Sequence, residues 1–585
     1  MWISFLLISL IVLLVGIICV VRKAKHNSAQ PESIIRRLSA VVFMASVMLF
    51  IPIYWDYFER IPNKWFQVFF MSIHNAIRLF VVDSDFDIIK DHIGSLGDTL
   101  RMSYGIYSAI LFVVAPIMTF GLVLSLFNNF VSRTKLLLNR KKHIYLFSAL
   151  NENSILLAES IRDRTNRALV AFTKSEENGD DGIQDLVVRA KAMGALCLNS
   201  DIEHLHLTGR KTSAPLTVFF LETDESTAIG KAVEYVSRNK EKQSADVFLF
   251  SSSLEGEMAV SSLACGNIRL RNINIFQSYT YRMLFEQGEQ IFDKAKSNNN
   301  ISALIFGLGS FGGEFAKALL WFGQMEGFSL ELHLIELPGD QGEENLQWIK
   351  SAKESCNTLL NGTQIKEYSF GKQLFDWAIE LSEKTPATFI VIDTGKDKVN
   401  LELARCLRQA YARVHSHPII RTVYTDSSAA QAISRAVNYK GEKYDIGFLG
   451  LSSECYSADV VFNSEVEQLG LLRHKRYASQ TCSLDEVESS FWNNSYNYKS
   501  SIAAAIHRKM KEYCNVDGIK ISPDKRTNTQ TDKLRRLEHR RWSAFMLSEG
   551  YVYNTVRNDI AKTHPCLVPF DSLSKKDQEK DDEDI

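Results

Sequence analysis

Three long apolar stretches open the chain and predict helices that cross a membrane. They cover residues 2–21, 38–55 and 106–127. About 20 apolar residues in helical form cross a bilayer core of about 30 Å. A shorter stretch, 65–82, places His74 and Arg78 one turn apart on one face, which favours an interfacial or re-entrant amphipathic helix over a fourth span. Residues 1–130 are therefore predicted to be a transmembrane region.

Basic residues next to these stretches predict the orientation of the chain. Arg22, Lys23 and Lys25 follow the first stretch, and Arg133 and Lys135 follow the third. Basic flanks face the cytoplasm, so three spans place the N-terminus outside and everything after about residue 130 inside. Because the basic residues follow the first apolar stretch rather than precede it, we expect a retained anchor, not a cleaved signal peptide.

From residue 143 the pattern changes to short apolar strands that alternate with amphipathic helices. This alternation is typical of a doubly wound α/β sheet, and it occurs twice, over 143–290 and 300–480. A helical connector with a polar linker follows (489–530), and then a small, mainly helical C-terminal domain (531–585). The predicted fold is α/β, with three N-terminal transmembrane helices, two tandem Rossmann-like domains and the small helical domain.

The second α/β region contains a glycine-rich turn between a strand and a helix. Its sequence is Gly307-Leu308-Gly309-Ser310-Phe311-Gly312. Glycines in this pattern let the backbone approach a pyrophosphate at a helix N-terminus. Glu336 ends the next strand, and Asp393-Thr394 ends a later one. An acid at the position of Glu336 either bonds a ribose hydroxyl or is an ordinary strand end. We expect these residues to bind NAD or a related adenine nucleotide.

The first α/β region repeats the plan without the glycines. Ser148, Leu150 and Asn153 stand where the three glycines would be. Side chains at these positions crowd the approach of a pyrophosphate, so this region is predicted to be a degenerate partner. Asn151 and Asn153 leave open the alternative of an anion-binding turn.

The last helical stretch, 533–553, carries charged and aromatic residues on one face. Glu538, Arg541, Trp542 and Phe545 follow the spacing i, i+3, i+4 and i+7. A carboxylate, a guanidinium and an indole on one stripe can clamp a planar charged ligand. The alternative is a packed core in which Glu538 and Arg541 satisfy each other.

Two resemblances add to these patterns. Residues 187–236, with Gly194-Ala195, Asp201 and Thr223-Asp224-Glu225, and residues 391–404 resemble the TrkA-N/RCK ligand-binding domains, which regulate potassium channels and transporters. Residues 531–585 are similar to the RyR domain. The motifs that match are Glu538-His539-Arg540-Arg541-Trp542, Gly550-Tyr551, His564-Pro565 and Leu567-Val568-Pro569-Phe570. The RyR resemblance implies a sensor of a nucleotide-derived ligand, held by Glu538, His539, Arg541, Trp542 and Tyr551.

Composition narrows the class of protein further. Lys and Arg (67) nearly balance Asp and Glu (68), so no footprint for nucleic acid is present. The nine cysteines are scattered and predict no metal site. No nucleophile elbow, phosphate-binding P-loop or zinc-protease motif is evident.

These signals favour binding over catalysis. We therefore expect a nucleotide-sensing regulator or effector of the bacterial inner membrane, assembled as a homo-oligomer, whose membrane part conducts ions in one version of the hypothesis. An antiviral defence effector and an ion-homeostasis regulator are two forms of it. The alternative is a membrane-anchored enzyme that depends on NAD(P) or processes nucleotides.

Overall fold

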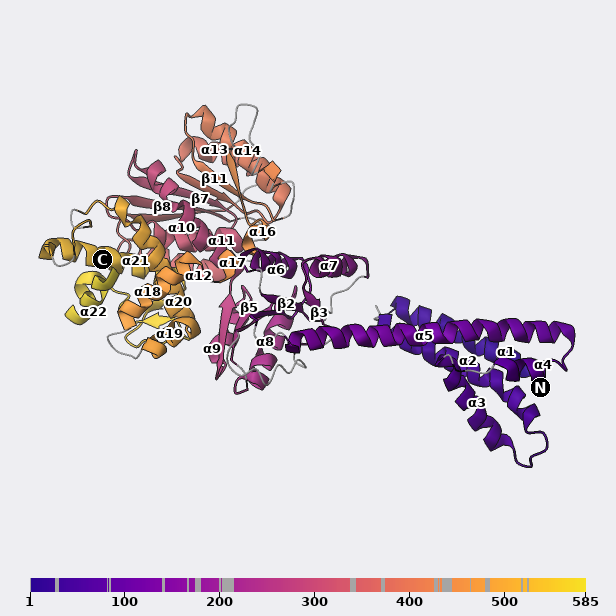
Figure 1. Cartoon of the computed structure of the whole chain (residues 1–585). Helices are drawn as coiled ribbons and strands as arrows, with labels where there is room; N and C mark the ends of the chain where they lie inside the picture. The colour runs from indigo at the N-terminus through magenta and orange to yellow at the C-terminus, as the bar shows by residue number, and fades with distance from the viewer. Residues whose placement is uncertain are drawn as a thin grey trace. The chain divides into compact units, whose positions relative to one another are not determined.

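The structure is a computed structural model that describes most of the chain. The described ranges are 2–26, 31–81, 83, 86–138, 142–165, 168–173, 180–198, 201–202, 215–242, 244–336, 343–369, 374–425, 430, 432–433, 445–462, 464–478, 484–516, 519–522 and 525–584. The chain divides into two compact units, and each is described by itself. The first contains residues 1–140, 175–191 and 196–199, and the second contains the remainder (Figure 1).

The first unit holds the predicted membrane helices. They are α1 (Trp2–His26), α2 (Pro31–Tyr57), α3 (Trp65–Phe80), α4 (Phe86–Ile93) and α5 (Asp98–Leu138). Three of them are long and apolar enough to cross a membrane, over Trp2–Cys19, Arg37–Tyr57 and Asp98–Phe120. The three predicted apolar helices are thus present. The third candidate span begins earlier than predicted, and the side chains of 121–127 lie outside the described ones.

Helices α3 and α4 form a hairpin that follows α2 only part of the way. Lys64 Nζ, just before α3, donates to the carbonyl of Trp55 near the end of α2. At the other end of α3, the ring of Phe80 lies 6.0 Å from Phe43, in the middle of α2. Helix α4 then returns, with His92 5.9 Å from Tyr57 at the end of α2. The segment therefore starts and finishes near the end of α2, and an interfacial or re-entrant position in a membrane stays a prediction.

Helix α3 is amphipathic in an inverted sense. Ser72 and Asn75 are buried in the bundle, and Asn75 Nδ2 donates to Tyr54 Oη. Its exposed residues include Trp65, Phe66, Phe69 and Phe70 together with Gln67, His74 and Ile77. Small and polar side chains between helices with apolar side chains outside are typical of packing in lipid, where helices gain nothing from hiding apolar surface.

Two parallel six-stranded sheets follow the apolar helices, and all of their strands except the one at 196–197 belong to the second unit. The first consists of β1 (Ile144–Phe147), β2 (Leu169–Phe172), β3 (Leu196–Cys197), β4 (Leu216–Phe220), β5 (Ala245–Phe250) and β6 (Ile268–Ile273), in the order β3-β2-β1-β4-β5-β6. Its connecting helices are α6 (Glu152–Arg164), α7 (Asp180–Ala192), α8 (Glu225–Asn239) and α9 (Leu254–Ser262). The order is that of doubly wound dinucleotide-binding folds.

The second sheet repeats this order. Its strands are β7 (Asn300–Phe306), β8 (Ser329–Glu336), β9 (Thr363–Ser369), β10 (Phe389–Ile392), β11 (Ile419–Val423) and β12 (Ile446–Leu449), arranged β12-β11-β10-β7-β8-β9. The helices are α10 (Ile275–Ala295), which links the sheets, α11 (Ser310–Phe322), α12 (Glu343–Ser355), α13 (Leu374–Lys384) and α14 (Asp397–Arg413). Strands β7 and β10 pair directly, so their last residues, Phe306 and Ile392, lie side by side.

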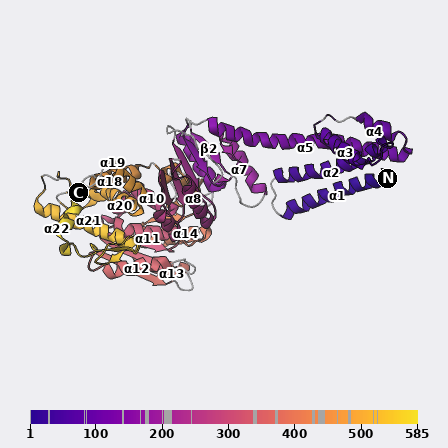
Figure 2. The ribbon, with the colours of Figure 1, turned by 90° about the horizontal axis from the view of Figure 1, so that it is seen from below.

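Helices complete the second unit. After α16 (Ser452–Cys455) and α17 (Ala458–Val461) come α18 (Glu465–Ala478), α19 (Leu484–Asn493), α20 (Ser495–Met510) and α21 (Asn528–Ser548). Short elements end the chain: β13 (Val552–Tyr553), β14 (Thr563–His564) and α22 (Lys575–Glu579). Figure 2 shows α18, α19 and α20 as one group with α21 alongside.

The last long helix differs from its predicted range of 533–553. It begins at Asn528 because Thr527 and Gln530 form a capping box at its N-terminus. It ends at Ser548, and the chain then turns into β13. The polar stretch before residue 533, predicted as linker, is thus partly the first turn of α21.

Candidate functional site

The glycine-rich turn connects β7 to α11 and needs two of its three glycines for the fold. Gly307 has a φ of +86°, in the left-handed region that glycine favours. A Cβ on Gly312 would stand 2.0 Å from the carbonyl oxygen of Gly307, so no side chain fits there. A Cβ on Gly309 would stand 3.6 Å from Asp393 Oδ2, an ordinary contact. Gly309 is therefore the position at which a ligand, rather than the fold, would demand glycine.

Asp393 occupies the helix end that was predicted to receive a phosphate. Its Oδ2 accepts hydrogen bonds from the backbone N–H groups of Phe311 (2.9 Å) and Gly312 (3.1 Å). The residue is only 6% exposed. These N–H groups are the donors that meet a pyrophosphate in dinucleotide sites. Asp393 thus lies at the turn, where its carboxylate occupies the N–H groups that a phosphate would use, and its part in binding a nucleotide stays a prediction.

The other predicted nucleotide residues are arranged less favourably. The Phe311 side chain is buried against Phe276 and Tyr279 of α10, so it supports the fold and does not face a ligand. Thr394 turns to Asn400 Oδ1, to which its N and Oγ1 donate at 2.7 and 2.6 Å. Ser310 and Glu336 are exposed, and a ribose contact by Glu336 stays a prediction.

The first sheet also fills its carboxyl edge with its own side chains. Asn151 caps α6 by accepting from Ser154 N at 2.9 Å, and its Nδ2 donates to the carbonyl of Leu221 at 2.6 Å. Both ends of the Asn151 amide are thus engaged within the fold, which disfavours the alternative of an anion-binding turn. Glu225 accepts from Ser251 Oγ (2.7 Å) and from the N–H groups of Ser252 and Ser253 (3.2 Å each) at the start of α9.

In the C-terminal domain, Glu538 and Arg541 form a buried ion pair. Glu538 is 2% exposed and Arg541 is fully buried. Arg541 Nη2 donates to Glu538 Oε1 at 2.6 Å, Lys511 Nζ donates to Oε2 at 3.4 Å, and Arg473 lies 3.7 Å from Oε1. Burial raises the pKa of Glu538, but these cations outweigh burial and hold the pKa well below its usual value. Both residues therefore lie in the core and satisfy each other, as in the alternative stated from the sequence, and a ligand contact by them stays a prediction.

The remaining predicted ligand residues surround Trp542, which is half-buried. Trp542 Nε1 donates to Tyr496 Oη at 3.1 Å, and its ring lies 4.9 Å from His564 and 5.7 Å from His539. His539 is buried, with Nε2 2.9 Å from the carbonyl oxygen of Val568. Tyr551 is buried as well, its ring 6.0 Å from Tyr496. Of the five predicted residues, Trp542 alone keeps an intermediate exposure in the described structure.

Two residues beside Trp542 were missed. Tyr496 belongs to α20, outside the predicted C-terminal domain, and Arg557 lies 5.1 Å above its ring. Burial lowers the pKa of His564 to about 4, so this histidine is neutral at physiological pH. The face made by Trp542, Tyr496, His564 and Arg557 presents rings and one guanidinium, which also bonds the carboxylate of Asp559 at 3.0 and 3.1 Å. Rings with a guanidinium are groups that bind flat anionic molecules.

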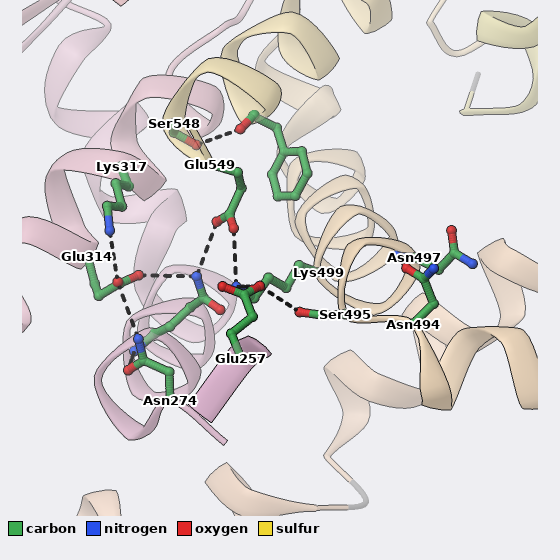
Figure 3. Close-up of polar contacts among 12 residues, drawn as sticks. Glu257, Asn274, Glu314, Lys317, Asn494, Ser495, Asn497, Lys499, Ser548 and Glu549 are labelled. Atoms are coloured by element: carbon green, nitrogen blue, oxygen red, sulfur yellow. Dashed lines mark hydrogen bonds and ion pairs between the residues drawn. The ribbon is translucent and has the colours of Figure 1, made fainter. Parts of the chain in front are cut away.

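A network of charges joins α21 to other parts of the second unit (Figure 3). Lys499 of α20 bonds Glu549 Oε2, at the end of α21, at 3.2 Å and Glu257 of α9 at 3.3 Å. Gln277 of α10 connects Glu549 (3.3 Å) with Glu314 of α11 (3.2 Å). Burial alone would lower the pKa of Lys499, but the three carboxylates outweigh burial and raise it.

The network therefore ties the C-terminal domain to the helix that follows the glycine-rich turn and to the first sheet. Attraction to Lys499 lowers the pKa of Glu257 to about 2, so this carboxylate is charged throughout the physiological range. Lys317, 3.3 Å from Glu314, has its pKa raised by that carboxylate. A movement of α21 that displaces Glu549 would leave Lys499 with one bonded carboxylate in a partly buried position.

Comparisons with known proteins give a match for the C-terminal part of the chain. The fold defines a chain with apolar helices near its N-terminus, two parallel β-sheets with connecting helices, and a small helical module. Residues 514–585, which contain α21 with Trp542, match the model of the RyR domain family. No curated protein matches the chain. Among solved structures, a crystal structure of a mutant of the protein GsuK is similar, with 12% identity, a TM-score of 0.32, and coverage of 72% of this chain and 95% of that one.

Proposed function

We propose that the chain is a regulator of the bacterial inner membrane that responds to a nucleotide-derived ligand and does not turn it over. The observation that carries this proposal is the network around Lys499, which joins the RyR domain to α11 and α9 through charged groups. A sensor acts on a distant part only if its ligand favours one of two arrangements. The network gives ligand binding at α21 a direct path to both sheets.

The ligand-binding face in this proposal is Trp542 with Tyr496, His564 and Arg557. Stacking on the indole and attraction to the guanidinium would hold a flat, negatively charged molecule. NAD or a related adenine nucleotide is a second proposed ligand, at Gly307, Gly309 and Gly312. Binding there requires that Asp393 leave the N–H groups of Phe311 and Gly312. The second site is therefore closed unless a ligand, or a change of conformation, displaces the carboxylate.

The proposed target of regulation is the helix bundle of the first unit. In this bundle the end of α3 lies against the middle of α2, with the ring of Phe80 6.0 Å from Phe43. The described core of the bundle is packed with apolar side chains such as Leu49, Ile53 and Leu111. An ion-conducting form would need several copies around an axis, and we propose a homo-oligomer.

Ion flux from vesicles tests the regulatory function. The purified full chain, reconstituted in lipid vesicles, is exposed to a panel of adenine nucleotides and their cyclic and ribosylated derivatives. We expect at least one to change the flux, and Trp542→Ala to remove the response. Tyr553→Ala, at an exposed ring of the same domain, is the matched control. A flux that no member of the panel changes would contradict the proposal.

A second measurement separates the regulator from the alternative of an enzyme. The protein is incubated with NAD, NADH and any nucleotide that changes the flux, and products are counted by mass spectrometry. We expect the nucleotide to be recovered intact. Several turnovers per protein molecule would establish an enzyme and refute the pure sensor.

A further inference from the structure

Arg535, His539 and Trp542 lie on one stripe of α21, because they are spaced i, i+4 and i+7. The rings of His539 and Trp542 are stacked, with 5.7 Å between their centres. Trp542 stands at one end of the stripe and Arg535 at the other, about 10 Å apart along the helix axis. The stripe therefore continues the Trp542 face toward a guanidinium.

The chain's own acidic segment, residues 577–582, occupies the basic end of this stripe. Arg535 donates from both Nε and Nη2 to the carboxylate of Asp582. A phosphate group would bind a guanidinium through the same pair of hydrogen bonds. The carboxylate of Asp582 thus takes the position that the phosphate of a ligand would take. The acidic residues of the segment are Asp577, Glu579, Asp581 and Asp582, and Lys580 is its one basic residue.

Polar contacts, rather than packing in the core, hold the acidic segment in place. Helix α22, which supplies its first residues, buries none of its side chains. Gln578 Nε2 donates to the carbonyl of Phe570 at 3.0 Å. Segments with few buried apolar contacts open at a low cost in free energy. The acidic segment is therefore suited to leave α21 without unfolding the domain.

One of these contacts is unfavourable in its present form. Asp581 Oδ2 is buried and lies 3.5 Å from His539 Nδ1, and it makes no hydrogen bond within the described part of the chain. Burial raises the pKa of Asp581 more than His539 lowers it, so the charged carboxylate is disfavoured at this position. The same carboxylate lies beside the histidine that stacks on Trp542, where it would repel an anion bound to the indole.

We propose that the acidic segment regulates the Trp542 site as an internal competitor, and that a flat ligand carrying phosphate groups displaces it. The ring system of the ligand would lie on Trp542, and its phosphates would take the guanidinium of Arg535 from Asp582. A nucleoside diphosphate in an extended form can bridge the two ends of the stripe. The inference rests on the proposed function for the ligand at Trp542 and adds to it the regulation of that site.

Competition sets the sign of the expected effect. A ligand that binds only after the segment has left α21 has an apparent affinity reduced by the fraction of molecules in which the segment has left. A change that weakens the contact between Asp582 and Arg535 raises this fraction. Such a change should therefore tighten the binding of the ligand.

Equilibrium dialysis of labelled ADP against the detergent-solubilised full chain tests the competition. Asp582→Asn removes the charged partner of Arg535 and should tighten ADP binding about threefold to fivefold, the range for a partly exposed ion pair. Asp581→Ala/Asp582→Ala should tighten it further. Asp571→Asn is the matched control, because Asp571 bonds Arg536 of the same helix in the same paired way but lies outside the segment. This control should leave the affinity unchanged.

A synthetic peptide of residues 574–585 gives a second measurement. Added in excess to Asp581→Ala/Asp582→Ala, the peptide should compete with ADP, and the same peptide with Asp582→Asn should compete less. Adding Trp542→Ala to the double variant should remove the gained affinity for ADP. This result assigns the gain to the Trp542 site rather than to the glycine-rich turn.

Four outcomes would overturn the inference: ADP binding that neither variant tightens, an equal gain in Asp571→Asn, a gain that survives Trp542→Ala, or a peptide that does not compete. If the gain and the competition appear while vesicle flux never responds to a nucleotide, the inference stands and the proposed function fails. If flux responds and the segment variants need the same nucleotide concentration as the wild type, the proposed function stands and the inference fails.

Discussion

The replacement of Asp393 by alanine decides whether the glycine-rich turn is a nucleotide site. In the wild type the carboxylate accepts two hydrogen bonds, at 2.9 and 3.1 Å, from the start of α11. A hydrogen bond to a charged group contributes about 1.5–3 kcal/mol. With the lower value for each of the two bonds, a phosphate that displaces the carboxylate must offset about 3 kcal/mol of hydrogen-bond free energy. This cost raises the dissociation constant of the nucleotide about 100-fold.

We therefore expect Asp393→Ala to bind NAD or ADP about 100-fold more tightly than the wild type. Asp393→Asn keeps an acceptor oxygen but loses the charge, and neutral hydrogen bonds are about half as strong, so its gain should be intermediate. The assay is equilibrium dialysis of labelled nucleotide against the solubilised full chain. Because the expected result is a gain of binding, partial unfolding of a variant cannot mimic it.

A second change on the same background identifies where the nucleotide sits. A Cβ at Gly309 makes only ordinary contacts in the fold, at 3.6 Å from Asp393 Oδ2, yet it would stand where a pyrophosphate approaches. Asp393→Ala/Gly309→Ala should lose the gained affinity and keep the melting temperature of Asp393→Ala. An affinity that is unchanged or lower in Asp393→Ala would refute the reasoning and show that the carboxylate supports the ligand.

Three further predictions concern buried charges. Glu538→Gln leaves the buried Arg541 without its carboxylate and should cost about 3–5 kcal/mol, seen as a lower melting temperature of the full chain; a loss under 1 kcal/mol would contradict a buried pair. His507 is fully buried and burial lowers its pKa to about 3. As pH falls below about 6.5, this histidine takes up a proton in the unfolded chain but not in the folded one, so acid favours unfolding. The free energy of unfolding should therefore fall by about 2 kcal/mol at pH 5. Thermal melts in acid should show a smaller loss for His507→Gln. Lys499→Met should abolish the flux response while nucleotide binding persists, whereas Lys475→Met, at an exposed pair, should change neither.

The sequence was sufficient for the architecture because apolar periodicity depends on local neighbours. Alternating strands and helices predicted both sheets, and the three apolar stretches predicted three long helices. The spacing of Glu538, Arg541 and Phe545 correctly placed them on one face of a helix. Periodicity does not tell whether a charged face is exposed or buried. The buried carboxylate of Glu538 is stabilised in part by Lys511 and Arg473, which come from other helices. No local pattern in the sequence connects these two cations with Glu538.

The candidate sites were harder to predict for the same reason. An acid at the end of a strand, such as Asp393, looks the same in the sequence whether it contacts a ligand or replaces one. Its role follows from the pairing of β7 with β10, which sets it beside the start of α11. Tyr496 was not predicted because it belongs to the connector, and only the packing of α20 on α21 brings it to Trp542. Contacts between segments that are distant in sequence decide both cases.

The carboxyl edges of the two sheets share one feature that bears on where a ligand acts. Helix N-termini carry N–H groups without partners in the helix, and they attract anions. In this chain the protein supplies the anions itself, with Asp393 at α11 and Glu225 at α9. These carboxylates occupy the N–H groups that a phosphate would need at both edges. In the proposed function, the response to a ligand therefore begins at the face around Trp542 and reaches the sheets through Glu549 and Lys499.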